Sequence, residues 1–303
     1  SYRTLKDSGV KYYDFEGNEL DDAGFFKLLK DSGINYVRIR VWNNPYDASG
    51  NGYGGGNNDL QKAVDMGKLA TDAGMRVMID FHYSDFWADP AKQKAPKAWA
   101  DMTIAEKTAA VKDYTMNSLN TLLDAGVDVG MVQVGNETNN GIAGENGLEN
   151  ANTTAIFRAG CEAIQQVEQE RSRVIKAVVH FANPEKQNYM TYADELAKTG
   201  VEYDVFGSSY YPYWHGTLDN LKNQLNAITE NYGKEVMVAE TSWATGLEDS
   251  DGHANTVREG NNDAGMDYDF SIYGQAKELR EVINTVAEMN KGIGVFYWEP
   301  AWI

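Results

Sequence analysis

The sequence predicts a (β/α)₈ TIM barrel, a ring of parallel strands enclosed by helices, in a single domain over residues 1–303. Short runs rich in β-branched residues alternate with longer helical segments, which is typical of a parallel sheet covered by helices. Glycines stand where helices give way to strands, and polar and aromatic residues gather where strands end. A chain of 303 residues that is 42% hydrophobic suits one such domain.

The elements follow one another in regular order. Strands are expected at residues 36–42, 76–82, 130–135, 174–181, 204–211, 235–239 and 292–298. Helices are expected at residues 21–30, 59–73, 104–125, 154–169, 189–198, 218–231 and 273–289. Gly74 and Gly126 follow two of these helices, as expected of C-terminal caps, because glycine readily adopts the left-handed backbone found there.

The count of strands leaves the barrel incomplete. An eighth strand would have to precede the helix at residues 21–30, and a closing helix would have to follow residue 303. We therefore expect this stretch to lack the first strand and the last helix of its barrel. An open, doubly wound sheet is the alternative architecture. The Gly/Asn-rich residues 51–58 are expected to form a flexible loop, because no Lys-Ser/Thr of a phosphate-binding loop follows them.

Composition narrows the class of partner. The net charge of -18 disfavours nucleic acid and anionic membranes, and it suits a neutral ligand such as a sugar, although acidity can also serve solubility alone. No apolar stretch reaches the ~20 residues of a membrane span. Cys161 is the single cysteine, so neither an internal disulfide nor a thiolate metal cluster can form.

Ionisable and aromatic residues follow the predicted strands. In barrels of this kind the active site lies at the carboxyl ends of the strands. The residues at these ends are Arg38, Arg40, Trp42, Asp80, His82, Tyr83, Asp85, Trp87, Asn136, Glu137, His180, Tyr210, Tyr211, Tyr213, Trp214, Glu240, Trp243, Trp298 and Glu299. So many polar and aromatic groups at corresponding positions predict a functional rim, which packing alone does not explain.

Two glutamates at this rim suit glycoside cleavage. Glu137 and Glu240 follow strands that face each other across a barrel. A retaining glycosidase needs two carboxyl groups roughly 5–5.5 Å apart, one as acid/base and one as nucleophile. Burial and the second carboxylate would keep Glu137 protonated, while donors such as Arg38 and a tyrosine hydroxyl would keep Glu240 ionised. The alternative is that either glutamate only pairs with an arginine.

Several motifs carry a family resemblance. Residues 132–138 (VQVGNET) resemble the acid/base strand of the large clan of barrel glycosidases. Five further segments resemble glycoside hydrolase family 53, the endo-β-1,4-galactanases: residues 37–43 (VRIRVWN), 80–90 (DFHYSDFWADP), 209–213 (SYYPY), 239–243 (AETSW) and 296–303 (FYWEPAWI). The resemblance extends over nearly the whole chain.

The resemblance implies a role for each matching residue. Glu137 would be the acid/base and Glu240 the nucleophile, with Arg38 orienting the nucleophile and Asn136 binding the sugar. The other implied substrate-binding residues are His82, Trp87, Tyr211 and Trp298. Tyr210 is the alternative to Tyr211, and a hydrogen-bonded core histidine is the alternative for His82. Trp87 and Trp298 would stack on sugar rings.

Residues 249–255 form an acidic loop after the seventh strand of the barrel. Spacing alone favours a solvated loop, because the Gly and Glu positions of an EF-hand are not matched. Bacterial members of the resembled family bind calcium here, which implies a structural calcium held by Asp249, Asp251, His253 and Asn255. Catalysis by two carboxylates would need no cofactor, and the other histidines are too scattered to indicate zinc.

These observations predict a secreted or cell-surface, endo-acting, retaining hydrolase of β-1,4-galactan, a side chain of plant pectin. It is expected to act as a monomer without nucleic-acid or membrane partners. The alternatives are another clan member acting on mannan, xylan or cellulose, a non-catalytic sugar-binding barrel, and a structural or partner-binding barrel.

Overall fold

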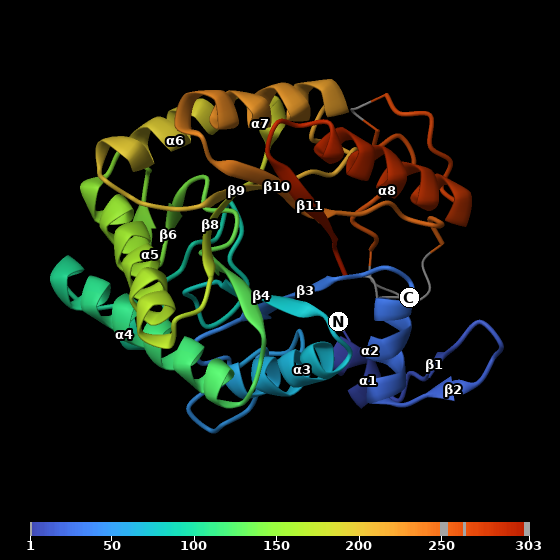
Figure 1. The fold of residues 1–303 in the computed structure, drawn as a ribbon, viewed down its shortest axis with the longest axis horizontal. Coiled ribbons are helices and arrows are strands. Elements are labelled where there is room, and N and C mark those ends of the chain that lie inside the picture. The colour runs from blue at the N-terminus through green and yellow to red at the C-terminus, as the bar shows by residue number, and fades with distance from the viewer. Residues whose placement is uncertain (1, 249–253, 263–264, 300–303) are drawn as a thin grey trace. The chain divides into compact units, whose positions relative to one another are not determined.

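A computed structural model describes residues 2–248, 254–262 and 265–299, and in it helices and strands alternate along the chain (Figure 1). The parallel strands are β3 (Tyr36–Val41), β4 (Arg76–Phe81), β5 (Val129–Val134), β8 (Lys176–Phe181), β9 (Val205–Ser209), β10 (Glu235–Thr241) and β11 (Gly292–Tyr297). Helix α2 (Asp22–Asp31) precedes β3, and the helices between the strands are α3 (Leu60–Asp72), α4 (Ile104–Asp124), α5 (Ala151–Arg171), α6 (Tyr189–Lys198), α7 (Leu218–Tyr232) and α8 (Ile272–Ala287). Each predicted element is present, with bounds that differ by at most three residues.

Short elements were not predicted. They are helix α1 (Tyr2–Asp7), the antiparallel hairpins β1 (Tyr12–Tyr13) with β2 (Glu19–Leu20) and β6 (Gly141–Ile142) with β7 (Glu145–Asn146), and the 3₁₀ turns η1 (Lys97–Trp99) and η2 (Pro184–Lys186). Strands of two residues carry no alternation of polar and apolar side chains, so no sequence period marks them.

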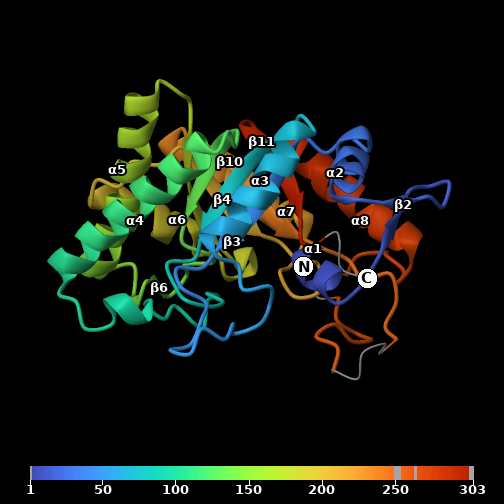
Figure 2. The same ribbon diagram turned by 90° about the horizontal axis from the view of Figure 1, so that it is seen from below.

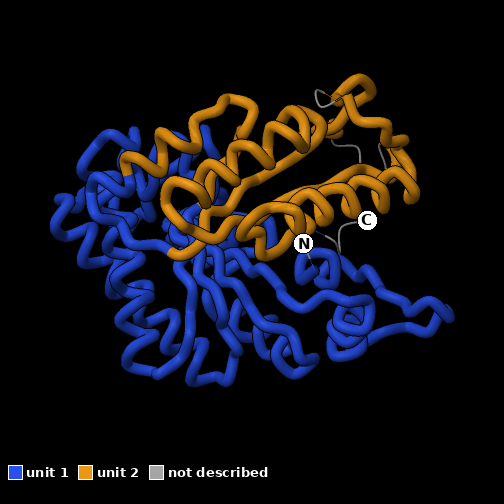
Figure 3. Tube along the Cα trace, turned by 45° about the horizontal axis from the view of Figure 1, so that its top comes forward, with its two compact units in different colours: residues 1–179, 196–203, 299–303 blue, residues 180–195, 204–298 orange. Residues whose placement is uncertain are grey.

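The chain divides into two compact units (Figure 3). Unit 1 comprises residues 1–179, 196–203 and 299–303, and unit 2 comprises residues 180–195 and 204–298. The boundary falls inside β8, whose first four residues belong to unit 1. A single catalytic domain over residues 1–303 stays a prediction.

Neighbouring strands follow the order of the chain. In unit 1 the order is β3-β4-β5-β8, and β3 and β4 pair in parallel from Tyr36 opposite Arg76 to Val41 opposite Phe81. In unit 2 the end of β8 is followed by β9, β10 and β11, again in parallel. A doubly wound sheet reverses its strand order at a switch point. The uninterrupted order excludes that alternative for the described strands.

Helices cover the strands with their apolar faces. In unit 1, α3 packs on β3 and β4, and α4 lies beside α5 (Figures 1 and 2). The buried residues of α3 recur three or four positions apart, namely Ala63, Val64, Gly67 and Ala70. Its first turn is capped by the Asp59 carboxylate, which accepts from the Lys62 amide. In unit 2, α7 and α8 pack on β10 in the same manner.

The loops that matter for function follow the carboxyl ends of the strands. Figure 2 shows the loops after β3, β4 and β5 extending from one end of the unit 1 strands. Side chains near these ends are therefore brought together although they are distant in sequence. Among the described helices, none combines the length and the apolar character that a bilayer span requires.

Candidate active site

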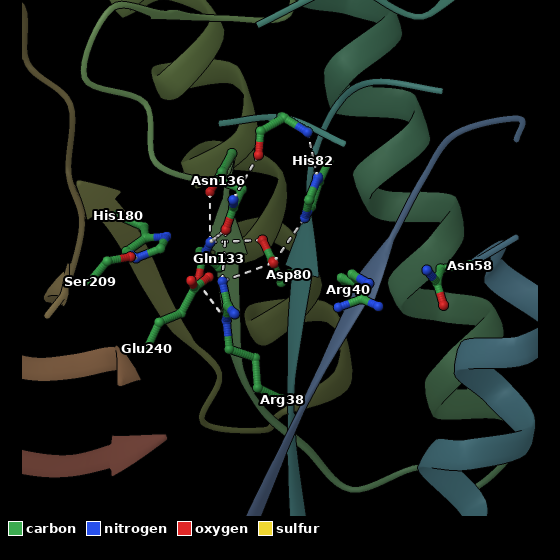
Figure 4. Close-up of polar contacts among 12 residues, drawn as sticks. Arg38, Arg40, Asn58, Asp80, His82, Gln133, Asn136, His180, Ser209 and Glu240 are labelled. Atoms are coloured by element: carbon green, nitrogen blue, oxygen red, sulfur yellow. Dashed lines mark hydrogen bonds and ion pairs between the residues drawn. The ribbon is translucent and has the colours of Figure 1, made fainter. Parts of the chain in front are cut away.

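A buried polar network surrounds Asp80 where β3, β4 and β5 end (Figure 4). Asp80 is fully buried, and its Oδ2 lies 2.9 Å from Arg38 Nη2 and 3.2 Å from His82 Nε2. Its Oδ1 accepts a hydrogen bond of 2.7 Å from Gln133 Nε2. Burying a carboxylate is costly unless cations and donors surround it, and here Asp80 has both.

The same network orients Asn136. Arg38 Nη2 donates to Asn136 Oδ1 at 2.8 Å, and Arg38 Nε donates to Gln133 Oε1 at 3.1 Å. Asn136 Nδ2 donates to the Ala88 carbonyl at 2.8 Å. The Asn136 amide therefore has one orientation, with its oxygen toward the guanidinium.

Glu137 follows Asn136 in an uncommon backbone conformation. Its φ is 46°, in the left-handed region that non-glycine residues seldom occupy, and Gly135, two residues earlier, has a φ of 80°. Such strained residues cluster at functional sites. The Glu137 side chain is half-buried.

Glu240 lies near the end of β10 and is buried. Tyr211 donates its hydroxyl to Glu240 Oε2 at 2.9 Å, whereas Tyr210 donates its hydroxyl to the Gly216 carbonyl at 2.9 Å. The geometry thus places Tyr211, rather than Tyr210, on the predicted nucleophile. A tyrosine hydroxyl bonded to a carboxylate stabilises its charged form.

His215 fixes the backbone of Tyr211 through a hydrogen bond. Its Nδ1 accepts a hydrogen bond of 3.1 Å from the Tyr211 backbone amide. Burial lowers the pKa of His215 to about 4, so the imidazole is neutral near pH 7 and can accept. Tyr211 is consequently held at its backbone as well as at its hydroxyl.

The two predicted catalytic carboxyl groups belong to different units, Glu137 to unit 1 and Glu240 to unit 2. Their separation, and the orientation of Glu240 by Arg38, stay predictions. Within the units, Glu137 has a left-handed backbone conformation, and Glu240 is buried and accepts a hydrogen bond from Tyr211.

His82 is buried, and both of its ring nitrogens are hydrogen-bonded. Nε2 faces Asp80, and Nδ1 accepts from the Ala88 backbone amide at 3.0 Å. This geometry favours the alternative of a hydrogen-bonded core histidine over a direct sugar contact. His82 joins Asp80 to the loop after β4.

Trp87 and Trp298 are partly exposed residues. The Arg40 guanidinium lies over the Trp87 ring, 4.1 Å from its centroid, and Arg40 also pairs with Glu299 at 2.8 Å. Trp298 follows β11, and its backbone amide donates to the Thr241 carbonyl at 2.8 Å.

Two tryptophans that we placed at the rim are core residues instead. Trp42 and Trp243 are almost fully buried, so their prediction as rim residues is wrong. Trp243 stacks with both Tyr213 and Phe270, with centroid distances of 4.7 and 5.0 Å. Proximity to a strand end does not determine direction, because the chain turns Trp243 into this aromatic cluster.

Most of the predicted calcium ligands cannot be placed. Asp249, Asp251 and His253 lie outside the described residues. Asn255 is described, and its Nδ2 donates to the Leu247 carbonyl at 3.0 Å, which leaves Oδ1 as the atom for a metal. Within the described part of the chain, no group of three or more His, Cys, Asp or Glu side chains is arranged to hold a metal ion.

Sequence reasoning missed Gln93, Gln133 and His215. Gln133 gave a usable signal, because it is a polar residue inside the otherwise apolar strand β5. Gln93 and His215 gave none, because their importance comes from contacts that only the folded chain creates. Gln93, for example, bonds to residues more than 40 positions away.

The chain is similar to known proteins along its whole length. The sequence model of glycosyl hydrolase family 53 matches residues 1–303. An endo-beta-1,4-galactanase of Bacillus subtilis (strain 168) is 51% identical over 301 residues, which are 99% of this chain and 68% of the relative. An arabinogalactan endo-beta-1,4-galactanase of Humicola insolens is 35% identical over 306 residues, covering 98% of this chain and 86% of the relative.

A solved structure supports the same relationship. The catalytic domain of a family 53 glycoside hydrolase from Ignisphaera aggregans has a TM-score of 0.91 and 40% identity, covering 99% of this chain and 82% of that one. The predicted (β/α)₈-barrel fold is thereby confirmed. The match along the whole sequence, the identity to curated relatives and the shared fold establish that the chain belongs to glycosyl hydrolase family 53 and is a glycosidase.

Proposed function

We propose that this protein is an endo-acting, retaining hydrolase of β-1,4-galactan. The observation that carries the proposal is Glu240, buried at the end of β10 with a tyrosine hydroxyl on its carboxylate, in a chain of family 53. Relatives at 51% and 35% identity are named as endo-beta-1,4-galactanases, which supports galactan as the substrate.

The reaction proceeds in two displacements. The Glu240 carboxylate attacks the anomeric carbon while the Glu137 carboxyl gives its proton to the leaving glycosidic oxygen, and the C–O bond breaks. The Glu137 carboxylate then takes a proton from water, whose oxygen attacks the same carbon and releases Glu240. Two inversions at one carbon return the original configuration.

Substrate contacts come from the surrounding side chains. Asn136, oriented by Arg38, is proposed to bind the sugar 2-hydroxyl through the second hydrogen of its amide. Trp87 and Trp298 are proposed as stacking platforms because both are partly exposed aromatic residues near strand ends. His82 contributes by fixing Asp80 and the backbone of Ala88.

Two substitutions test the catalytic pair. Glu137→Gln and Glu240→Gln keep the shape of each side chain but remove proton transfer or nucleophilic attack, so galactan turnover should fall on the order of 10³-fold or more. Glu162→Gln, an exposed change on α5, is the control and should leave turnover unchanged. Near-wild-type rates in either catalytic variant would contradict the assignment.

Product analysis tests the stereochemistry and the substrate. Proton NMR during digestion of galactan should show the β-anomer first, and mid-sized oligosaccharides should appear early if cleavage is internal. Net inversion would exclude Glu240 as a nucleophile. Higher activity on mannan, xylan or cellulose than on galactan would favour another clan specificity.

The acidic loop at residues 249–255 is proposed to hold a structural calcium. Its donors are carboxylate, amide and backbone oxygens from Asp249, Asp251, Asn255 and His253, which suit a hard cation. Calcium that binds only the folded protein raises its stability. The melting temperature should therefore rise with Ca²⁺ and fall with a chelator, and a melting temperature insensitive to both would refute the site.

The enzyme is further proposed to act as a monomer. It is also proposed to act outside the cell, because a galactan polymer does not cross a membrane. Size-exclusion chromatography tests the first point. Galactanase activity in the culture medium of the source organism, compared with washed cells, tests the second.

A further inference from the structure

The loop after β4 holds the backbone around Glu137. Glu137 has a φ of 46°, and a conformation of this kind is unfavourable and persists only where the surroundings impose it. The residues that impose this conformation therefore influence the orientation of the Glu137 side chain, the predicted acid/base. They lie in the short segment from Ala88 to Gln93.

One side chain bonds both peptide groups that flank the Glu137 Cα atom. Gln93 Nε2 lies 2.8 Å from the Asn136 carbonyl oxygen and 3.2 Å from the Glu137 carbonyl oxygen. The first carbonyl belongs to the peptide that sets φ of Glu137, and the second belongs to the peptide that sets its ψ. Gln93 thus acts on both rotations that determine where the Glu137 side chain points.

Gln93 is itself held in place. Its Nε2 also lies 2.9 Å from the Asp89 carbonyl oxygen, so the two amide hydrogens are shared among three carbonyls. The Gln93 backbone carbonyl accepts from the Gly144 amide at 2.6 Å. The side chain is buried. The turn before it is closed by two backbone hydrogen bonds between Asp89 and Lys92, of 3.0 and 2.9 Å. These bonds fix the position of the Gln93 side-chain amide relative to the carbonyls of Asn136 and Glu137.

We propose that Gln93 is a positioning residue for the general acid/base, because its amide holds the peptides on either side of Glu137. This rests on the proposed function. Proton transfer requires heavy atoms within about 2.6–3.2 Å of each other, and a displacement of ~1 Å in an active site can cost ~10²-fold in rate. Rotation of either flanking peptide would move the Glu137 carboxyl by a comparable distance.

The proposal predicts an effect that depends on the leaving group. Protonation matters for the sugar that leaves from galactan, but it hardly matters for dinitrophenolate, a stable anion. Gln93→Met keeps length and burial without the donor, so kcat/KM on galactan should fall about 10²-fold. The kcat/KM on 2,4-dinitrophenyl β-1,4-galactobioside should stay within about threefold of wild type.

A matched control separates this role from loop stability. Asn140 Nδ2 donates to the Pro90 carbonyl at 2.8 Å, which is a different bond between the same two loops. Asn140→Ala should leave both kcat/KM values within about threefold of wild type, because neither carbonyl beside Glu137 is touched. Azide should accelerate turnover of the dinitrophenyl substrate by Gln93→Met, as expected when the base of the second step is impaired.

Two outcomes overturn the proposal: equal losses by Gln93→Met on both substrates, or a galactan rate close to wild type. A wild-type protein that cleaves aryl galactobiosides but not galactan would overturn only the assigned polymer. In that case, the kcat/KM of Gln93→Met on phenyl galactobioside is compared with its kcat/KM on dinitrophenyl galactobioside. The loss relative to wild type should be larger on the phenyl substrate, whose leaving group needs protonation.

Discussion

Glu278 is a buried carboxyl group next to the strand of the predicted nucleophile. It extends from α8 and accepts a hydrogen bond from the hydroxyl of Thr241, the residue after Glu240. Burial, together with a smaller effect of the Glu281 charge, raises the pKa of Glu278 to about 7, although the hydrogen bond from Thr241 opposes the shift. The side chain therefore gains its charge near neutral pH inside unit 2, where a charge is costly.

This residue should make stability depend on pH. Because the pKa of Glu278 in the folded state lies above its ordinary value of 4.5, the folded protein binds the extra proton between these values. Its contribution to stability is complete below pH 4.5 and is lost as the pH rises through 7. Relative to Glu278→Gln, the wild type should lose about 2 kcal/mol between pH 5 and pH 8.

Urea denaturation of both proteins at the two pH values measures this difference. Glu281→Gln is a useful comparison, because it removes the second cause of the raised pKa while leaving Glu278 in place. Parallel pH dependence in wild type and Glu278→Gln would mean that Glu278 does not titrate in this range.

At the scale of the elements, α5 approaches β5 through a glycine. A Cβ atom at Gly160 would lie 2.7 Å from Val134 Cγ1 and 3.1 Å from the Tyr83 hydroxyl oxygen. Val134 ends the strand that leads to Glu137, and Tyr83 packs in the core behind it. The absence of a side chain at residue 160 therefore sets how closely this helix covers the strand.

Gly160→Ala should destabilise the protein although alanine favours helices. The gain in helix propensity is about 1 kcal/mol, while overpacking a rigid interface costs about 1–3 kcal/mol. We expect a net loss of about 1 kcal/mol in the free energy of unfolding, measured with urea. Glu162→Ala, on the exposed side of α5, introduces alanine without a clash and should be nearly neutral. A Gly160→Ala protein as stable as wild type would show that the helix shifts without cost.

At the scale of the whole molecule, one ion pair joins β3 to Glu299, the second residue after β11. Arg40 Nη1 lies 2.8 Å from Glu299 Oε1, although 259 positions separate the two residues. Both side chains are largely buried, with 11% and 18% of their surface exposed. Both residues belong to unit 1, so the pair attaches the end of the described chain to the beginning of the sheet.

Removing one side chain of the Arg40–Glu299 ion pair should lower the free energy of unfolding more than removing both side chains. Glu299→Ala leaves the Arg40 charge buried without its carboxylate, so the free energy of unfolding should fall by about 3 kcal/mol. The double variant Arg40→Met with Glu299→Ala should recover part of this loss, because no lone charge remains. A double-mutant cycle by urea denaturation measures the coupling. Additive losses would show that the pair contributes little.

The strands and helices were predictable because their causes are local. Apolar residues recur in α3 at helical spacing. Asp59 and Thr103 cap the first turns of α3 and α4, and a glycine follows the last turn of each of these helices. The hairpins of β1 with β2 and of β6 with β7 escaped prediction, since two-residue strands are stabilised by partners that a sequence window does not contain.

The candidate site was predictable only in part. Asn136 and Glu137, and likewise Glu240, were found because polar residues directly follow apolar strands, and their roles came from family-like motifs. The direction of a side chain after a strand was not predictable: Trp243 turns into an aromatic cluster, while Trp87 stays partly exposed beside Arg40.

The sequence by itself therefore determined the alternation of strands and helices, the barrel class and the two candidate carboxyl groups, because hydrophobic spacing, caps and strand ends depend on neighbours along the chain. The tertiary structure alone decided which tyrosine meets Glu240, that His82 is a buried, fully hydrogen-bonded histidine, and that Gln93 bonds the carbonyls beside Glu137. These contacts join residues that are distant in the chain, and they exist only after the strands have been brought side by side.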